Sequence, residues 1–301
     1  GREHTDGQDL ETILEDVTIK PEFAELEYDV NQINSLIENV IQLESVACKD
    51  WLTNKVDRSV TGRIAKQQGA GKLQLPLNNV GVIALDYQGK SGFATTIGHA
   101  PVAGLVDAPK GSVLSIAESL TNIIWAPLSD HIQSISLSAN WMWPAKNPGE
   151  NARIYEAVQA ASDFACALGI NIPTGKDSMS MTQKYKDDLV YAPGTVIITA
   201  SGEVSDLKKV VEPVLVNDES KEILLIDLSF TERALGGSAF AQSINKYSDD
   251  VLMSMMLKAE NLTDDFDDEK NAIRQRSIML VVAYDSLHVG NNQSIDRLIN
   301  H

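Results

Sequence analysis

The sequence predicts a mixed α/β or α+β fold with about two domains. Short apolar runs typical of strands alternate with longer stretches in which apolar residues recur every three or four positions. The chain has 301 residues, which is long enough for roughly two hydrophobic cores at about 150 residues per domain. Of these residues 43% are hydrophobic and 22% are charged, which is ordinary for a folded protein.

The distribution of charge divides the chain into three segments. Residues 1–45 carry 2 basic and 12 acidic residues, and residues 206–301 carry 10 and 17, whereas residues 46–205 carry 13 of each. We interpret 1–45 as an acidic linker that ends in a helix, 46–205 as a first domain and 206–301 as a second. The net charge of −17 argues against sequence-independent binding to nucleic acid, which requires clustered Lys and Arg.

The composition also bears on the cellular compartment. No apolar run approaches the roughly 20 residues that span a bilayer, and the N-terminus lacks the basic and hydrophobic layout of a signal peptide. We therefore expect a cytoplasmic protein that has no membrane partner. Cys48 and Cys166 match no metal or redox spacing, so we expect them to be buried free thiols.

Local patterns predict the elements in order. Strands are expected at 80–87, 92–97, 132–140, 194–202 and 222–228, and helices are expected around 36–43, 110–126 and 150–168. The helix at 110–126 has its apolar stripe at Val113, Leu114, Ala117, Leu120 and Ile124. The helix at 150–168 follows a loop at 144–149, and its expected buried stripe is Ile154, Val158, Ala161, Ala165 and Leu168, with Gly169 as its stop.

Two segments resemble ligand-binding loops at first sight. Residues 168–178 resemble a P-loop at first sight, but five residues separate Gly169 from Gly175 where a P-loop has four, and Asp177 stands where Ser or Thr should bind magnesium. We interpret this segment as a plain loop. The acidic run 264–269 lacks the spacing of a calcium loop and is interpreted as a solvated face.

Two other segments leave two interpretations open. Glu118 and Asn122 are four residues apart on one helix face and could ligate Mg²⁺ through oxygen, or could form a solvated or locally hydrogen-bonded face. Segment 54–63 could clamp an anionic substrate through Lys55, Arg58 and Arg63, or could be an exposed, salt-bridged loop.

Six short motifs occur in a fixed order that resembles one family. They are NKVDRSVTG at 54–62, LVD at 105–107, AESLTN at 117–122, SANWM at 138–142, PGE at 148–150 and GKDSMS at 175–180. Together they resemble the second half of the synthetase region of phosphoribosylformylglycinamidine synthase, large form. LGGSAFAQ at 235–242 fits the next domain of that family, so the resemblance covers about residues 46–245.

The resemblance implies both a fold and a reaction. The family amidates formylglycinamide ribonucleotide in purine biosynthesis, using ATP and glutamine-derived ammonia. Its fold resembles aminoimidazole ribonucleotide synthetase, with an N-terminal α/β subdomain at 46–205 and a C-terminal α+β subdomain that is partial or divergent here at 206–301. The implied partners are the first synthetase half and a glutaminase domain. Without them we expect the chain to be inactive, and we also expect it to form a homodimer.

Site residues follow from the same resemblance. The magnesium ligands of an auxiliary ATP or ADP site fall on Asn79, Glu118 and Asn122. Nucleotide contacts fall on Asn78, Lys176 and Asp177. Lys49 falls near the substrate cleft and takes the catalytic role, and Asp57, Arg58 and Thr61 are the expected substrate contacts.

The sequence departs from the family at two places. Large-form relatives usually have Asp at the position of Asn79, and an amide there supplies oxygen but no charge, which should weaken the hold on Mg²⁺. After about Lys246 the chain stops following the family. A non-catalytic scaffold or oligomerisation module with a decayed nucleotide site is therefore a second interpretation. A divergent aminoimidazole ribonucleotide or selenophosphate synthetase is a third.

Overall fold

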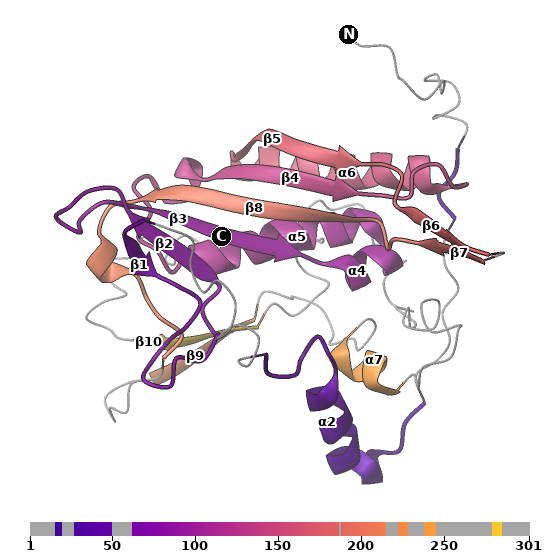
Figure 1. The fold of residues 1–301 in the computed structure, drawn as a ribbon, viewed down its shortest axis with the longest axis horizontal. Coiled ribbons are helices and arrows are strands. Elements are labelled where there is room, and N and C mark those ends of the chain that lie inside the picture. The colour runs from indigo at the N-terminus through magenta and orange to yellow at the C-terminus, as the bar shows by residue number, and fades with distance from the viewer. Residues whose placement is uncertain are drawn as a thin grey trace.

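A six-stranded sheet with two long helices on one face organises the central part of the chain (Figure 1). The computed structural model describes residues 16–19, 27–49, 62–186, 188–214, 222–227, 238–244 and 279–284. The strand order in the sheet is β1-β2-β3-β8-β4-β5. Neighbouring strands are antiparallel except β4 and β5, which run parallel and are joined through helix α6. The architecture is therefore mixed α/β, as predicted.

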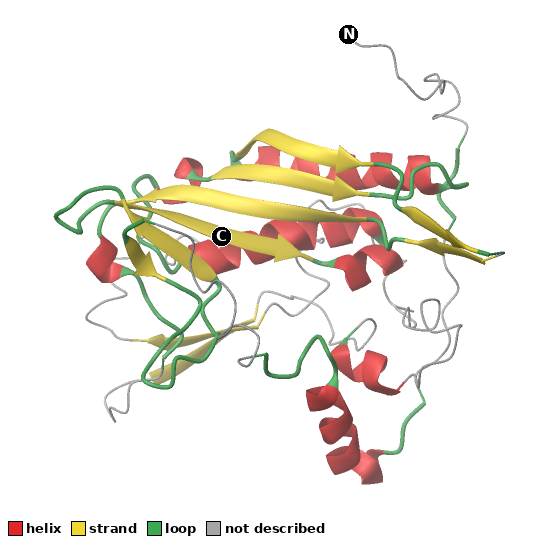
Figure 2. Ribbon diagram, viewed as in Figure 1, coloured by secondary structure: helices red, strands yellow, loops and turns green. Residues whose placement is uncertain are grey.

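The strands of the main sheet come from one stretch of the chain, residues 64–204. They are β1 (Ile64–Lys66), β2 (Val80–Ala84), β3 (Gly92–His99), β4 (Ser136–Met142), β5 (Asn171–Ser178) and β8 (Thr195–Val204). Two further pairs are separate from it: the hairpin β6 (Thr182–Tyr185) with β7 (Asp188–Tyr191), and β9 (Glu222–Asp227) with β10 (Met279–Tyr284) (Figure 2).

The helices differ in their packing. They are η1 (Val30–Gln32), α2 (Ile33–Gln42), α4 (Pro101–Val106), α5 (Ala108–Ile123), η2 (His131–Ser134), α6 (Glu150–Leu168), η3 (Leu207–Lys209) and α7 (Ala239–Ile244). Helix α5 packs against β3, β8 and α6, whereas α2 packs against α7. None of the described helices has the length and apolar character needed to cross a membrane.

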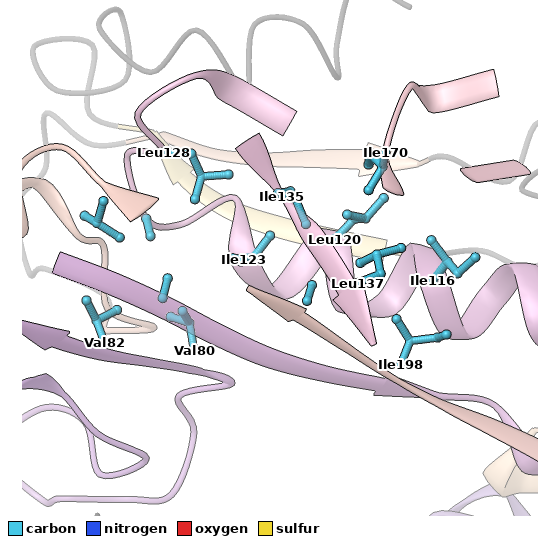
Figure 3. Packing of buried hydrophobic residues seen from close by; sticks show 14 of the residues in the cluster. Val80, Val82, Ile116, Leu120, Ile123, Leu128, Ile135, Leu137, Ile170 and Ile198 are labelled. Carbon is cyan, nitrogen blue, oxygen red and sulfur yellow. The ribbon is translucent and has the colours of Figure 1, made fainter. Parts of the chain in front are cut away.

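The hydrophobic core lies between the sheet and helix α5 (Figure 3). Residues at alternate positions of β2, β4 and β8 point into it, because side chains along a strand alternate between the two faces. The fully buried members include Val80, Val82, Ile116, Ile123, Leu137 and Ile198. The opposite face of β3 remains exposed, with Phe93 and Ile97 at 38% and 57% of their accessible surface. Among the described residues, helices therefore cover one side of the sheet, the side that α5 and α6 occupy.

Helix α6 begins and ends as predicted, and its predicted stripe is largely confirmed, because Ala161 and Ala165 are buried and Ile154 and Leu168 pack partly buried against the core. Ala157, Ala161 and Ala165 are buried, whereas Val158 is exposed, so the expectation for Val158 is wrong. Cys166 follows Ala165 by one residue and is also exposed, as is Cys48, so the expectation of buried thiols is wrong as well. One residue corresponds to about 100° around a helix, and that step carries Val158 and Cys166 away from the alanine face.

The expected bounds of several elements differ from the structure by a few residues, as for β2, which ends at Ala84, and two segments differ in the type of element. Residues 132–134 belong to η2, and the strand begins only at Ser136. Residues 171–178, which the sequence favours as a loop, form the strand β5. A Cβ atom at Gly175 would lie 2.1 Å from the carbonyl oxygen of Ala139 on β4. Gly175 therefore permits a close pairing with β4, which the polar sequence of the segment does not predict.

Candidate functional site

Asn79, Glu118 and Asn122 lie around one open pocket at the margin of the sheet. Asn79 immediately precedes β2, and Glu118 and Asn122 come from two successive turns of α5. The pocket has a volume of about 500 Å³ and is lined by Asn79, Gly81, Thr95, Thr96, Ile97, His99, Glu118 and Asn122. The three residues expected to bind magnesium are therefore neighbours in space, although 43 positions separate Asn79 from Asn122 in the chain.

The contact between β3 and α5 forms this pocket. A Cβ atom at Gly98 would lie 2.2 Å from the carbonyl oxygen of Ser115 and 2.4 Å from the amide nitrogen of Ser119, so the helix backbone rests directly on Gly98. The hydroxyl of buried Thr96 donates to the carbonyl oxygen of Ser119 at 2.8 Å. These contacts fix the height of α5 over the strand, and they place Glu118 beside the end of β3.

Glu118 is held at the mouth of the pocket by His99. The backbone N–H of His99 donates to Glu118 Oε2 at 2.6 Å, and His99 Nδ1 lies 3.7 Å from the same oxygen. Both side chains are about half exposed. One carboxylate oxygen of Glu118 is thus bound by the protein, and among the described residues the hydrogen bonds to this carboxylate leave Oε1 facing a ligand that enters the pocket.

Asn79 and Asn122 face each other across the pocket. Asn122 Nδ2 donates to the carbonyl oxygen of Ile97 at 3.0 Å, and Asn79 Nδ2 donates to Asn122 Oδ1 at 3.3 Å. Asn79 is exposed and Asn122 is half-buried. The two amides therefore form a continuous chain of hydrogen bonds that ends on the backbone of β3.

The donor chemistry of the pocket can be compared with the needs of Mg²⁺. Among the described residues no three His, Cys, Asp or Glu side chains gather closely enough to hold a metal ion. The described lining offers one carboxylate, Glu118, together with the amides of Asn79 and Asn122. Protein-bound Mg²⁺ usually has one or two carboxylates and completes its shell with water and substrate phosphates. The residues thus fit an ion that would be bound partly by the protein and partly by the phosphates of a nucleotide.

Asn78 and Lys49 lie outside this lining. Asn78 Nδ2 donates to the carbonyl oxygen of Gln67 at 2.8 Å, and its Oδ1 accepts from the N–H of Val80 at 3.5 Å, so the side chain ties the loop before β2 to that strand. Lys49 is partly buried and donates from Nζ to the carbonyl oxygen of Ala47 at 2.8 Å. The nucleotide-binding role of Asn78 and the catalytic role of Lys49 remain predictions.

The structure does not bring all the expected site residues together. Lys176 and Asp177 lie on β5, and β8 and β4 stand between that strand and β3. Lys176 Nζ donates to Ser178 Oγ at 2.7 Å. The expected substrate contacts Asp57, Arg58 and Thr61, as well as Lys55, lie outside the described residues.

Arg63, the last cation of segment 54–63, contacts the loop that follows β2. The Arg63 guanidinium donates to the carbonyl oxygen of Leu85 at 3.3 Å and lies 4.3 Å from the ring centre of Tyr87. These contacts place Arg63 beside the loop after β2. The run 264–269 lies outside the described residues.

His99 and Thr95 line the pocket although the sequence did not single them out. Both lie on the exposed face of β3, two register positions on either side of Ile97. The alternation of the strand carries the signal, because Thr95, Ile97 and His99 must share one face. What the alternation cannot show is that α5 crosses the strand at Gly98.

The chain matches a family model over residues 48–203, and the model is described as the FGAR-AT PurM_N-like domain. The match covers about half of the chain and includes β1 to β5, β8, α5 and α6 as well as the pocket. The chain therefore belongs to the FGAR-AT PurM_N-like domain family, and the resemblance seen in the motifs is confirmed.

Two curated relatives with the same enzyme name match most of the chain. A protein from Caenorhabditis elegans named "Probable phosphoribosylformylglycinamidine synthase" is 41% identical over 220 residues, which are 72% of this chain and 16% of that protein. The Homo sapiens phosphoribosylformylglycinamidine synthase is 40% identical over 215 residues, which are 71% of this chain and 16% of that protein. The chain thus spans about 16% of the length of these curated relatives. Among solved structures, PurLQS from Thermotoga maritima overlaps 75% of this chain and 33% of that chain, with a TM-score of 0.47 and 13% identity.

Proposed function

We propose that this chain is the part of a phosphoribosylformylglycinamidine synthase that holds an auxiliary adenine nucleotide with Mg²⁺. In this proposal it contributes to the ATP-dependent amidation of formylglycinamide ribonucleotide, a carbon–nitrogen ligation in purine biosynthesis. One observation carries the proposal: Glu118, Asn122 and Asn79 meet in a single open pocket within the segment that matches the family. Relatives of about 40% identity that bear this enzyme name support it.

Each proposed residue has a role that suits its chemistry. In ATP-dependent activation of an amide, negative charge develops on phosphoryl oxygens and is stabilised by Lys, Arg and Mg²⁺. Glu118 and Asn122 supply oxygens to the cation, and Lys49 stabilises charge near the substrate. The remaining contacts are assigned to nucleotide or substrate: Asn78, Lys176 and Asp177 to nucleotide, and Asp57, Arg58 and Thr61 to substrate.

The proposed active unit includes more than this chain. We place the nucleotide subdomain at 46–205, with 206–301 as part of a C-terminal subdomain, in a cytoplasmic protein. A first synthetase half pairs with the exposed sheet face, and a glutaminase supplies ammonia. Because a site composed of two halves needs both, this chain by itself is proposed to bind ligand without catalysing synthesis.

Titration calorimetry with MgADP tests the retained nucleotide site. We expect measurable binding to the native chain and at least about tenfold weaker binding to Glu118→Gln, because the substitution removes the negative charge that faces the cation. Asp163→Asn is the matched control, since it neutralises an exposed carboxylate on α6, away from the pocket, and should bind MgADP like the native chain.

The same titration separates a second candidate function. A non-catalytic scaffold is favoured by one observation, namely that the described lining of the pocket has a single carboxylate. If the native chain releases no binding heat with MgADP at millimolar concentration, the nucleotide site is absent and the scaffold is supported. Equal binding by Glu118→Gln would show that any nucleotide binds elsewhere.

A further inference from the structure

The orientation of the Asn79 amide follows from its neighbours. The Ile97 carbonyl can only accept a hydrogen bond, so Asn122 must turn Nδ2 toward it, at 3.0 Å. Asn122 Oδ1 then faces Asn79, where an oxygen would meet an oxygen unless Asn79 presents its nitrogen. The 3.3 Å contact from Asn79 Nδ2 to Asn122 Oδ1 satisfies this requirement. Strand β3 thus sets both amides, one through the other.

Asn79 presents a nitrogen, and not an oxygen, to Asn122 Oδ1. A metal ion could bind between the two side chains only if both of them presented oxygen. Asn122 Oδ1 already has a donor, and the oxygen of Glu118 nearest His99 accepts a backbone N–H. The pocket contains one negative charge among its described lining residues. Mg²⁺ dehydrates reluctantly and is held through carboxylates and phosphates, so one carboxylate gives little reason for a free ion to enter.

We propose that Asn79 acts in this site as a hydrogen-bond donor that holds Asn122 in place, and not as a metal ligand, so that the pocket takes Mg²⁺ only together with the phosphates of a nucleotide. The inference rests on the proposed function for the identity of the nucleotide. The hydrogen-bond chain Ile97–Asn122–Asn79 carries it independently, because it is set by the protein alone.

An aspartate at position 79 should reverse this behaviour. The side chain of Asn79→Asp would place a charged acceptor against Asn122 Oδ1, and the two oxygens would repel each other in the empty pocket. A cation between them would relieve the repulsion, and the pocket would then have two carboxylates. The substitution should therefore lower stability without metal and create a binding site for Mg²⁺ alone.

Thermal unfolding with chelator or with Mg²⁺ alone tests the proposal. For the native chain we expect no resolved change in Tm on adding millimolar Mg²⁺. Asn79→Asp should start from a lower Tm and gain about 2–4 °C with Mg²⁺. The gain should disappear in the double variant Asn79→Asp, Glu118→Gln. Gln88→Glu, which adds one charge in the exposed turn between β2 and β3, should show no gain.

A measurement on the native chain keeps the proposal testable if Asn79→Asp does not fold. Mn²⁺ electron paramagnetic resonance should show free ion when the protein is present without nucleotide. Once ADP is added, it should show a protein-bound ion whose spectrum differs from that of Mn²⁺ with ADP and no protein. Stoichiometric Mn²⁺ binding without ADP, lost in Glu118→Gln, would overturn the proposal. A native chain that gains Tm from Mg²⁺ alone as much as Asn79→Asp does would overturn it too. Failure of the proposed function has a different signature: the native chain then binds no MgADP, whereas Asn79→Asp still responds to Mg²⁺.

Discussion

The carboxylate of Asp16 caps a helix that begins far along the chain. Its oxygens accept the N–H groups of Gly149, Asn151 and Ala152 at 2.9, 3.1 and 3.1 Å. The N-cap residue of α6 is Gly149, which has no side chain to satisfy these donors. Thr18 adds a hydrogen bond to Glu156 at 2.9 Å. Part of the predicted linker is therefore attached to the folded core.

The pKa of Asp16 reflects this position. Burial raises the pKa of the carboxyl, but the backbone N–H groups of Ala152, Gly149 and Asn151 together hold it below its ordinary value. Because the folded-state pKa lies below the unfolded one, the cap contributes stability above about pH 4 and loses it as the pH falls through the lowered pKa.

Asp16→Ala should lower the free energy of unfolding by about 0.5–2 kcal/mol at neutral pH, the usual loss for a helix cap. Denaturant unfolding of both proteins across the acidic range measures the difference, which should shrink below about pH 4. Asp130→Ala is the control, because the Asp130 side chain makes no capping hydrogen bond to η2. A loss that is independent of pH would contradict the role of the charged carboxylate.

At the scale of elements, the crossing of α5 over β3 determines the geometry of the pocket. Backbone atoms of the helix lie against Gly98, and the hydroxyl of Thr96 donates a hydrogen bond to the helix backbone beside this contact. Ile116 and Ile123 of the same helix are fully buried in the core between α5 and the sheet. Any residue larger than glycine at 98 must push the helix outward, and Glu118 moves with it.

Gly98→Ala should therefore weaken MgADP binding and lower Tm together, since its Cβ would meet backbone atoms that cannot yield without moving the helix. Gly81→Ala provides the comparison within the same pocket, because its Cβ would meet only the carbonyl oxygen of Thr95 at 3.8 Å. Calorimetric titration and thermal unfolding of both variants check this. A Gly98→Ala protein with native Tm and native affinity would show that the close contact does not position Glu118.

The accuracy of the sequence predictions varied with how local the deciding interaction is. The helix at 150–168 was recognised because its periodicity and its stop at Gly169 are local signals. The strand β5 was missed because its pairing with β4 depends on a crossover and on the absence of a side chain at Gly175. His99 was missed for a related reason, since only the register of α5 against β3 brings it to Glu118.

At the scale of the whole molecule, one face of the sheet carries exposed apolar side chains. Ile83, Phe93 and Ile97 are 42%, 38% and 57% exposed on strands β2 and β3, whereas the other face is covered by α5 and α6. Exposed apolar surface on a sheet commonly marks an interface. In the proposed enzyme the partner on this face is the first synthetase half.

Without that half we expect this chain to pair with a second copy. Light scattering at tens of micromolar should give the mass of a dimer, and the double variant Ile83→Glu, Phe93→Glu should give that of a monomer, because buried charges oppose the contact. The far-ultraviolet circular dichroism of the variant should match the native spectrum, since both side chains lie outside the core. A monomeric native chain would contradict the expectation.

The position of β8 affects how the chain can fold during its synthesis on the ribosome. This strand lies at the middle of the sheet, paired on one side with β3 and on the other with β4, yet it is the last of the six to be synthesised. The hydrogen bond between the hydroxyls of Thr95 and Ser201, for example, can form only after another 106 residues have been added. Until then the β2–β3 hairpin and the β4–α6–β5 unit each present an open edge to other nascent chains. A translational pause before residue 204 would therefore prolong the interval in which the edges of β3 and β4 can aggregate.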